Sequence, residues 1–168
     1  MKLLIRILLV VPTLISAVFF IGTSSCKKDK CKGVSCQHEG ICHSGTCTCT
    51  FGYEGANCSV PWRNKFLGNW SQTGNSGSLS GQFAVSVVAD PVSVDSVMMI
   101  NFDNTFAEPV VAYVTASDCL VIPHQLIQDT GLVEVQGYIY YVSGGNITVF
   151  YERLNVLSNK LDTVNTHW

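Results

Sequence analysis

Six of the eight cysteines in this 168-residue chain lie within 28 residues, between Cys31 and Cys58. A segment this short cannot bury enough apolar surface to fold without crosslinks or a metal. Its larger apolar side chains are Val34, Ile41, Phe51 and Tyr53. In a cytosolic protein such a cluster would indicate a metal or catalytic site. Behind an export signal it predicts a disulfide framework, whose pairing the spacing leaves open.

The N-terminus has the composition of such an export signal. Residues 1–6 carry two positive charges, residues 7–21 are uncharged and mostly apolar, and small residues occupy 22–25. This is the layout of a secretory signal peptide, predicted here over residues 1–25. The uncharged run is shorter than the roughly 20 residues that a membrane-spanning helix needs, which favours a signal peptide over a retained anchor.

Cys26 follows these small residues and precedes the mainly cationic run Lys-Lys-Asp-Lys at 27–30. This order resembles the lipobox of bacterial lipoproteins, with Thr23 where that family usually has Leu. Ser-Ser-Cys-Lys-Lys-Asp is similar to lipoproteins of Bacteroidetes-type bacteria. The resemblance implies that Cys26 becomes the first mature residue, lipidated on its sulfur and its amine. Two or more acyl chains hold a protein firmly on a membrane. Residues 26–30 are therefore expected to be a tether at the outer membrane or cell surface, with plain secretion as the alternative.

The cysteine outside both the cluster and the lipobox is Cys119. It could bond to Cys26. If Cys26 is lipidated, Cys119 is instead expected to be a buried thiol in the apolar segment 118–122, and this is the simpler interpretation.

The cysteine cluster has a distinctive spacing, Cys31-x4-Cys36-x5-Cys42-x4-Cys47-x-Cys49-x8-Cys58, with Gly52-Tyr53-Glu54-Gly55 before the last cysteine. This pattern resembles the EGF-like domain over residues 31–58. The resemblance implies the disulfides Cys31–Cys42, Cys36–Cys47 and Cys49–Cys58. It also implies a role as a spacer or protein-contact unit.

No metal or cofactor is predicted in this module. Calcium-binding EGF-like domains carry acidic residues just before the first cysteine, whereas the lead-in 27–30 is mainly cationic, so no calcium site is expected. His38 and His43 are expected to be exposed loop residues, because disulfides consume the thiols that could complete a metal site.

Residues 59–65, stiffened by Pro61, are interpreted as a linker, and residues 66–168 as an all-β domain. Alternation is clear at 132–142, where Val133, Val135, Ile139 and Tyr141 share one face and Glu134, Gln136, Tyr138 and Tyr140 share the other. Period 2 with frequent turns predicts an antiparallel barrel or sandwich. The expected strands are 66–73, 82–89, 97–103, 110–115, 119–122, 132–142 and 147–157, with a possible edge strand at 164–168 and a hairpin turn at 143–146.

Gly68-Asn69-Trp70 on the first of these strands resembles the Gly-x-Trp of lipocalin-like (calycin-type) barrels. Short patches at 66–70, 100–102 and 120–125 are also similar to small lipocalin-like domains of Bacteroidetes lipoproteins. In that family the Trp plugs one barrel end and an Arg late in the chain covers it. The resemblance implies these barrel-end roles for Trp70 and Arg153. An ordinary core position for Trp70 is the alternative.

Charge and motif analysis exclude several classes of function. Residues 60–168 carry four Lys or Arg against nine Asp or Glu, and this acidic balance argues against nucleic-acid binding. Residues 74–78 and the isolated His124 give no triad, and most Asp residues fall at turns. The protein is therefore not expected to be an enzyme. A hydrolase would require His124 to meet two carboxylates in a cleft.

The sequence thus predicts an exported, membrane-tethered lipoprotein with a binding or adhesion role toward a protein or glycan at the cell surface. This hypothesis requires an exposed apolar or aromatic patch and a filled barrel interior. The alternative is a lipocalin-like carrier of one small apolar ligand, because a barrel of about eight strands has room for side chains or one such ligand.

Overall fold

In the computed structural model, residues 28–74, 81–128 and 132–168 are described. The predicted signal peptide and the predicted lipidation site Cys26 lie outside these residues. The chain is mainly β, as predicted, with two short 3-10 turns and no α-helix in the described part. No helix among the described residues is long and apolar enough to cross a membrane.

A small cysteine-rich module forms the N-terminal part. Strands β1 (Ile41–His43) and β2 (Thr46–Thr48) make one hairpin, and β3 (Tyr53–Glu54) pairs with β4 (Val60–Pro61). Three disulfides join Cys31 to Cys42, Cys36 to Cys47 and Cys49 to Cys58, the same pairs that the EGF-like resemblance implies. Closing each of these short loops stabilises the fold by roughly 3 kcal/mol in the chain-entropy model.

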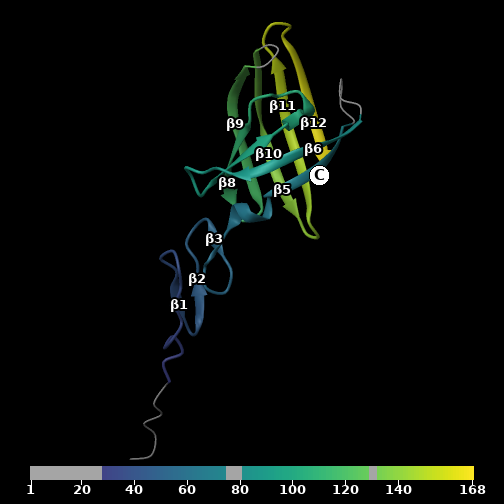
Figure 1. The fold of residues 1–168 in the computed structure, drawn as a ribbon. Coiled ribbons are helices and arrows are strands. Elements are labelled where there is room, and N and C mark those ends of the chain that lie inside the picture. Colours follow the sequence, from purple (N-terminus) through teal and green to yellow (C-terminus); the bar gives the residue numbers. More distant parts are fainter. Residues whose placement is uncertain (1–27, 75–80, 129–131) are drawn as a thin grey trace, which may run out of the picture.

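The rest of the chain forms one antiparallel sheet in sequence order, with β5 at one edge and β12 at the other. Its strands are β5 (Gly68–Gly74), β6 (Gly81–Ala89), β7 (Ser96–Ile100), β8 (Val110–Ala116), β9 (Cys119–Gln128), β10 (Leu132–Val142), β11 (Asn146–Asn155) and β12 (Lys160–His167). The sheet curls into a half-barrel, so that β5 and β6 cross in front of β10 to β12 (Figure 1). The sequence left a barrel and a two-sheet sandwich as alternatives. The single curled sheet is closer to the barrel.

Two local features bend this sheet. Val135 pairs with Gln125, and Gly137 pairs with Ile122, so Pro123 and His124 together face Gln136 in a β-bulge. A proline within a sheet is confined to edges and bulges, because it cannot donate to the ladder. The prediction that a strand ends at Ile122 was therefore wrong, because β9 continues through the bulge to Gln128.

The predicted strand 97–103 was also wrong at its end. β7 stops at Ile100, and Asn101, Asp103 and Asn104 have left-handed φ angles of 58°, 57° and 52°. Asn and Asp tolerate this region better than most residues. The chain turns there into η2 (Phe102–Asn104), which buries Phe102 and Asp103 instead of continuing the alternation.

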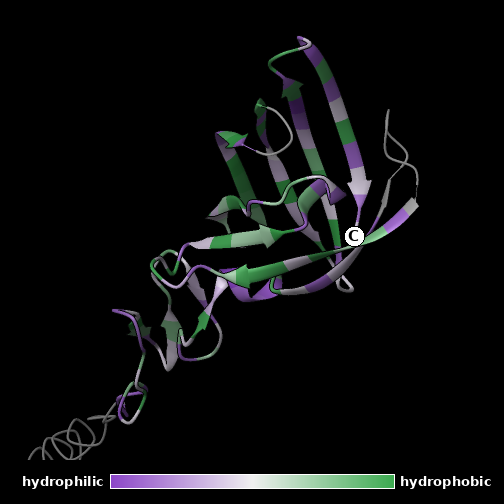
Figure 2. Ribbon diagram, turned by 45° about the horizontal axis from the view of Figure 1, so that its top comes forward, coloured by the Kyte–Doolittle hydropathy of each residue, from purple (hydrophilic) through white to green (hydrophobic). Residues whose placement is uncertain are grey.

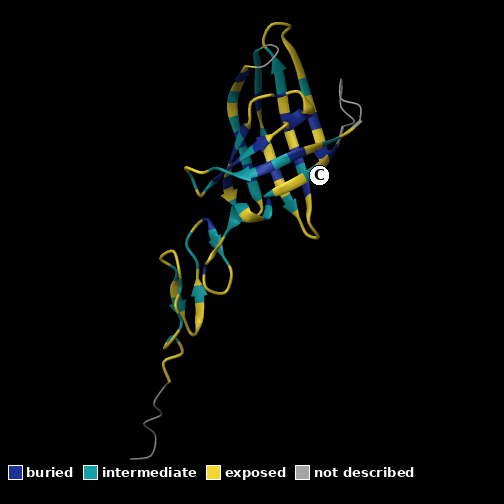
Figure 3. Cartoon of the chain, viewed as in Figure 1, coloured by how far each residue is buried: buried dark blue, intermediate teal, exposed yellow. Residues whose placement is uncertain are grey.

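The core fills the inside of the curled sheet. Inward positions alternate with outward ones along each strand, as Figure 3 shows for β10 to β12 and Figure 2 shows by hydropathy. The largest fully buried side chains include Tyr151, Phe66, Phe102, Met99 and Leu120. These large side chains occupy the interior that a ligand carrier would need to leave open.

An ordered junction joins the module to the half-barrel through η1 (Trp62–Lys65). Trp62 N–H donates to Gly52 O at 2.8 Å, and the Lys65 ammonium pairs with Glu54 at 2.8 Å. Arg63 donates on the other side to the carbonyls of Asp90, Ser93 and Ser96. The segment predicted as a linker is thus hydrogen-bonded to both parts.

Candidate functional site

A hollow with a volume of about 380 Å³ lies on the outer face of the half-barrel, over β9 to β12. Gly137 is one of its lining residues. A Cβ on Gly137 would lie 2.1 Å from Phe150 O and 2.7 Å from Tyr151 Cα. Only glycine permits this close approach of β10 to β11, and a glycine within a strand often marks such a bend. The bend and the neighbouring bulge together shape the hollow.

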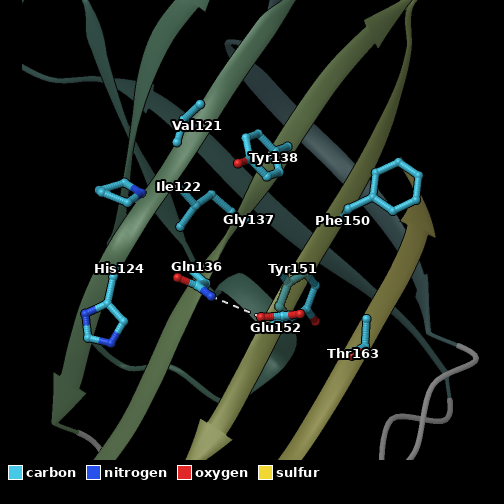
Figure 4. A pocket seen from close by; sticks show the side chains of 11 residues that line it. Val121, Ile122, His124, Gln136, Gly137, Tyr138, Phe150, Tyr151, Glu152 and Thr163 are labelled. Carbon is cyan, nitrogen blue, oxygen red and sulfur yellow. Dashed lines mark hydrogen bonds between the residues drawn. The ribbon is translucent and has the colours of Figure 1, made fainter.

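Aromatic side chains form one rim of this outer-face hollow. Tyr138 on β10 lies directly opposite Phe150 on β11, and both line the hollow (Figure 4). Tyr140 stacks on Tyr138 at 6.5 Å and meets Phe150 edge-on at 6.4 Å. We call these three residues the outer aromatic cluster. Tyr138, Tyr140 and Phe150 are 51%, 42% and 40% exposed, respectively. Such a contiguous patch is typical of an interaction surface, unlike a single exposed apolar residue.

Polar side chains form the opposite rim. Gln136 donates from Nε2 to Glu152 Oε2 at 3.0 Å, an interaction drawn in Figure 4. His124 Nε2 lies 3.2 Å from a carboxylate oxygen of Glu134. A second, smaller hollow adjoins the first. The carboxylates that line the two hollows are those of Glu134 and Glu152, and no Lys or Arg is among the lining residues. The rim therefore combines aromatic rings with negative charge.

The structure brings His124 together with two carboxylates, the arrangement that a hydrolase was expected to require. His124, Glu134 and Glu152 all line the second hollow of about 100 Å³ that adjoins the first. The His124 side chain is 59% exposed, so water reaches the pair freely. Catalytic acids and bases are more often found in desolvated clefts. Among the described residues, no group of three His, Cys, Asp or Glu side chains could hold a metal ion.

A polar cluster lies inside the half-barrel. The Tyr151 hydroxyl donates to Asp103 Oδ1 at 2.5 Å, and Arg153 donates to Asp103 Oδ2 at 2.5 Å. Arg153 also reaches Asp162 on β12 at 3.3 Å. Gln72 of β5 is fully buried beside Tyr151. The cluster connects η2 with β11 and β12 near the place where the two edge strands β5 and β12 come together.

The titration behaviour of this cluster follows from its burial. Burial raises the pKa of Asp103, although the hydrogen bond from Tyr151 and the charge of Arg153 oppose the shift. Burial and the neighbouring Asp103 raise the pKa of Tyr151, so its hydroxyl remains a donor. Lys160, and to a smaller extent Arg153, lower the pKa of Asp162. Asp103 and Tyr151 are buried in the core, whereas the Arg153 and Asp162 side chains are 16% and 19% exposed, so the cluster mainly joins elements of the fold.

The two predicted barrel-end residues lie in the half-barrel as follows. Trp70 packs against the core from β5, and its Nε1 donates to Phe66 O at 2.7 Å. Arg153 is mostly buried and pairs with Asp103 and Asp162. The packing of the C-terminal Trp168 edge-on against Phe102 was not anticipated from the sequence.

Cys119 differs from its prediction. Its thiol is free and only half-buried, at the start of β9 opposite Tyr140. The apolar run around it suggested full burial, but alternation places Leu120 and Ile122 inward, so Cys119 faces outward. In the module, His38 is exposed, as predicted, and its ring also stacks on Tyr53 at 3.8 Å while its Nδ1 lies 2.8 Å from Cys58 O.

No protein-family model, curated protein or solved structure matches the chain.

Among the residues that line the outer-face hollow, the sequence singled out only His124 as a candidate functional residue. It placed Gln136, Tyr138 and Tyr140 on one strand face but did not say that this face is the outer one. The hairpin turn at 143–146 sets the register that brings Phe150 opposite Tyr138, and this signal was available. The bulge that adds His124 to the hollow depends on pairing between β9 and β10, which no local pattern specifies.

Proposed function

We propose that the protein is an exported, membrane-tethered, non-catalytic binding lipoprotein that engages its partner through the outer aromatic cluster and the outer-face hollow. The observation that carries this proposal is the exposure of Tyr138, Tyr140 and Phe150 together beside a hollow. Tyrosine is enriched at the energetic centres of interfaces because its ring buries a large area and its hydroxyl can form a hydrogen bond.

In this proposal residues 31–58 are an EGF-like module that acts as a spacer or protein-contact unit. The first described residues lie at the end of the module far from the sheet (Figure 1). A lipid on Cys26 would then hold that end at the membrane. The ordered junction at η1 supports a semi-rigid connection that holds the half-barrel away from the membrane.

A lipocalin-like carrier is the alternative, with the half-barrel as its calycin-type domain. It receives less support, because Tyr151, Phe66 and Phe102 fill the inside of the sheet. The first hypothesis required a filled interior and an exposed aromatic patch, and both are present in the described residues.

Peptide and glycan arrays probed with the intact protein test the proposal. The double variant Tyr138→Ser/Phe150→Ser removes two rings that face solvent, so it is expected to fold and to lose most of the wild-type array signal. Tyr113→Ser is the matched control, because Tyr113 is exposed on the outer face of β8 outside the cluster.

Two results would contradict the proposal. One is a signal on either array that the double variant retains in full. The other is the absence of any signal together with a small apolar molecule that intact protein releases on denaturation, which would favour the carrier.

A further inference from the structure

Two carboxylates, and no Lys or Arg, are among the residues that line the outer-face hollow and its smaller neighbour. Glu152 lines the outer-face hollow beside Tyr138 and Phe150, and Glu134 lies next to it with His124. Residues 60–168 carry four Lys or Arg against nine Asp or Glu, so the domain as a whole is acidic. Oriented charge of this kind steers oppositely charged partners toward a site and repels those of like charge.

The ring faces and the carboxylate suit the same kind of ligand group. A guanidinium or ammonium group is attracted to the face of Tyr or Phe within about 6 Å of the ring centre. A carboxylate accepts short, charge-assisted hydrogen bonds from the same group. The labelled side chains in Figure 4 place Tyr138 and Phe150 on one side of the hollow and Gln136 and Glu152 on the other. A cationic side chain entering between them would meet both.

We propose that the partner is a basic polypeptide segment that inserts an arginine or lysine side chain into the outer-face hollow. The inference rests on the proposed binding function and names its partner class. The aliphatic stem of such a side chain would pack on the rings while the charged end reaches Glu152, since long cationic side chains cover apolar surface in this way.

The test uses fluorescein-labelled hexapeptides Gly-Ser-X-Gly-Ser-Gly, in which X is arginine, lysine or citrulline. Citrulline has the shape of arginine without its charge. Fluorescence anisotropy with the intact protein should show binding of the arginine and lysine peptides, and the citrulline peptide should bind at least about tenfold more weakly.

Two variants locate the interaction. Glu152→Gln should weaken binding of the arginine peptide by about 10- to 100-fold, because it removes a charge-assisted hydrogen bond. Tyr138→Leu keeps the apolar area but removes the ring face, and should weaken binding by about two- to fivefold. Glu108→Gln is the matched charge control, because Glu108 is exposed in the loop before β8 and lies outside the lining of the hollow.

Each remaining outcome overturns the inference. Equal binding of the citrulline and arginine peptides would remove the role of charge. Equal effects of Glu108→Gln and Glu152→Gln would mean that the hollow is not the site. Glycan-array binding that depends on Tyr138 and Phe150, without binding of the cationic peptides, would show that the proposed function stands and the partner class is wrong. If the protein binds neither the arrays nor the cationic peptides, the proposed function is overturned as well.

Discussion

At the scale of single residues, the buried carboxyl group of Asp103 has a large effect on the free energy of unfolding. Asp103 lies within the core and accepts hydrogen bonds from Tyr151 and Arg153. A buried charge without such partners would cost several kcal/mol, so these donors are required by the position of Asp103. The left-handed conformation of Asp103 brings it there, between two Asn residues that share that conformation.

Tyr151→Phe tests the first of these donors. It leaves the ring packing intact and removes one hydrogen bond to Asp103, which should lower the free energy of unfolding by about 1–3 kcal/mol. Urea unfolding measures the change, with Tyr113→Phe as the control on an exposed ring. A loss no greater than that of the control would mean that the buried bond adds nothing.

Asp103→Asn tests the pH dependence. In the folded state burial raises the pKa of Asp103 above its ordinary value of 3.8, so the folded protein holds that proton more tightly than the unfolded chain. The contribution of this carboxyl group to the free energy of unfolding is fully present below about pH 4. It is lost as the pH rises through the raised pKa. Urea unfolding across this range should show wild type losing stability relative to Asp103→Asn. A difference that is flat or grows with pH would contradict the burial account.

At the scale of secondary-structure elements, the outer-face hollow depends on how β9, β10 and β11 bend. Gly137 lets two backbones approach, and the bulge at Pro123 and His124 shifts the register beside it. Bulges and strand glycines are the usual means by which sheets curl. The same two features therefore produce the half-barrel and the hollow on its outside.

Gly137→Ala tests this dependence. The added Cβ would meet backbone atoms at 2.1 Å and 2.7 Å, which cannot move without separating β10 from β11. Overpacking of this kind should cost about 1–3 kcal/mol or more, measured by urea unfolding. Gln136→Ala, at the exposed neighbouring position, should cost much less. Equal stability of Gly137→Ala and wild type would mean that the strands can separate without loss.

Much of the element pattern could be predicted, because strict alternation marks strands whatever their partners are. The segments 82–89, 110–115, 132–142 and 147–157 correspond closely to strands β6, β8, β10 and β11. Errors arose where long-range pairing overrides local preference. Pro123 reads as a strand end but lies in a bulge, and Asn101 reads as strand but turns the chain. The edge strand β12 begins four residues before the predicted position, since pairing with β11 extends it to Lys160.

At the scale of the whole molecule, three crosslinked loops, an ordered junction and a curled sheet follow one another along the chain. Their order suits a protein that is tethered at one end and presents a surface at the other. The candidate site could be predicted only in kind, as an exposed aromatic patch. Its residues come from four strands, β9 to β12, whose relative placement is set by the fold.

Cys26→Ser tests the tether. Without a thiol to acylate, the protein should move from the membrane fraction to the soluble fraction on cell fractionation, because two or more acyl chains are what hold such a protein firmly. The mass of the wild-type protein should exceed that of the mature chain by its lipids even after denaturation. An unmodified wild-type protein recovered from the medium would replace the tether with plain secretion.

The central claim is that binding occurs on the outer face, and photo-crosslinking on intact cells tests it most directly. A photoreactive phenylalanine analogue replaces Phe150 in one protein and Leu157 in another, since Leu157 is an exposed apolar residue in the turn before β12 and lies outside the hollow. The account predicts a discrete covalent adduct from position 150 and little from position 157. Adducts of equal yield at both positions, or none from position 150 in cells where the protein is at the surface, would contradict it.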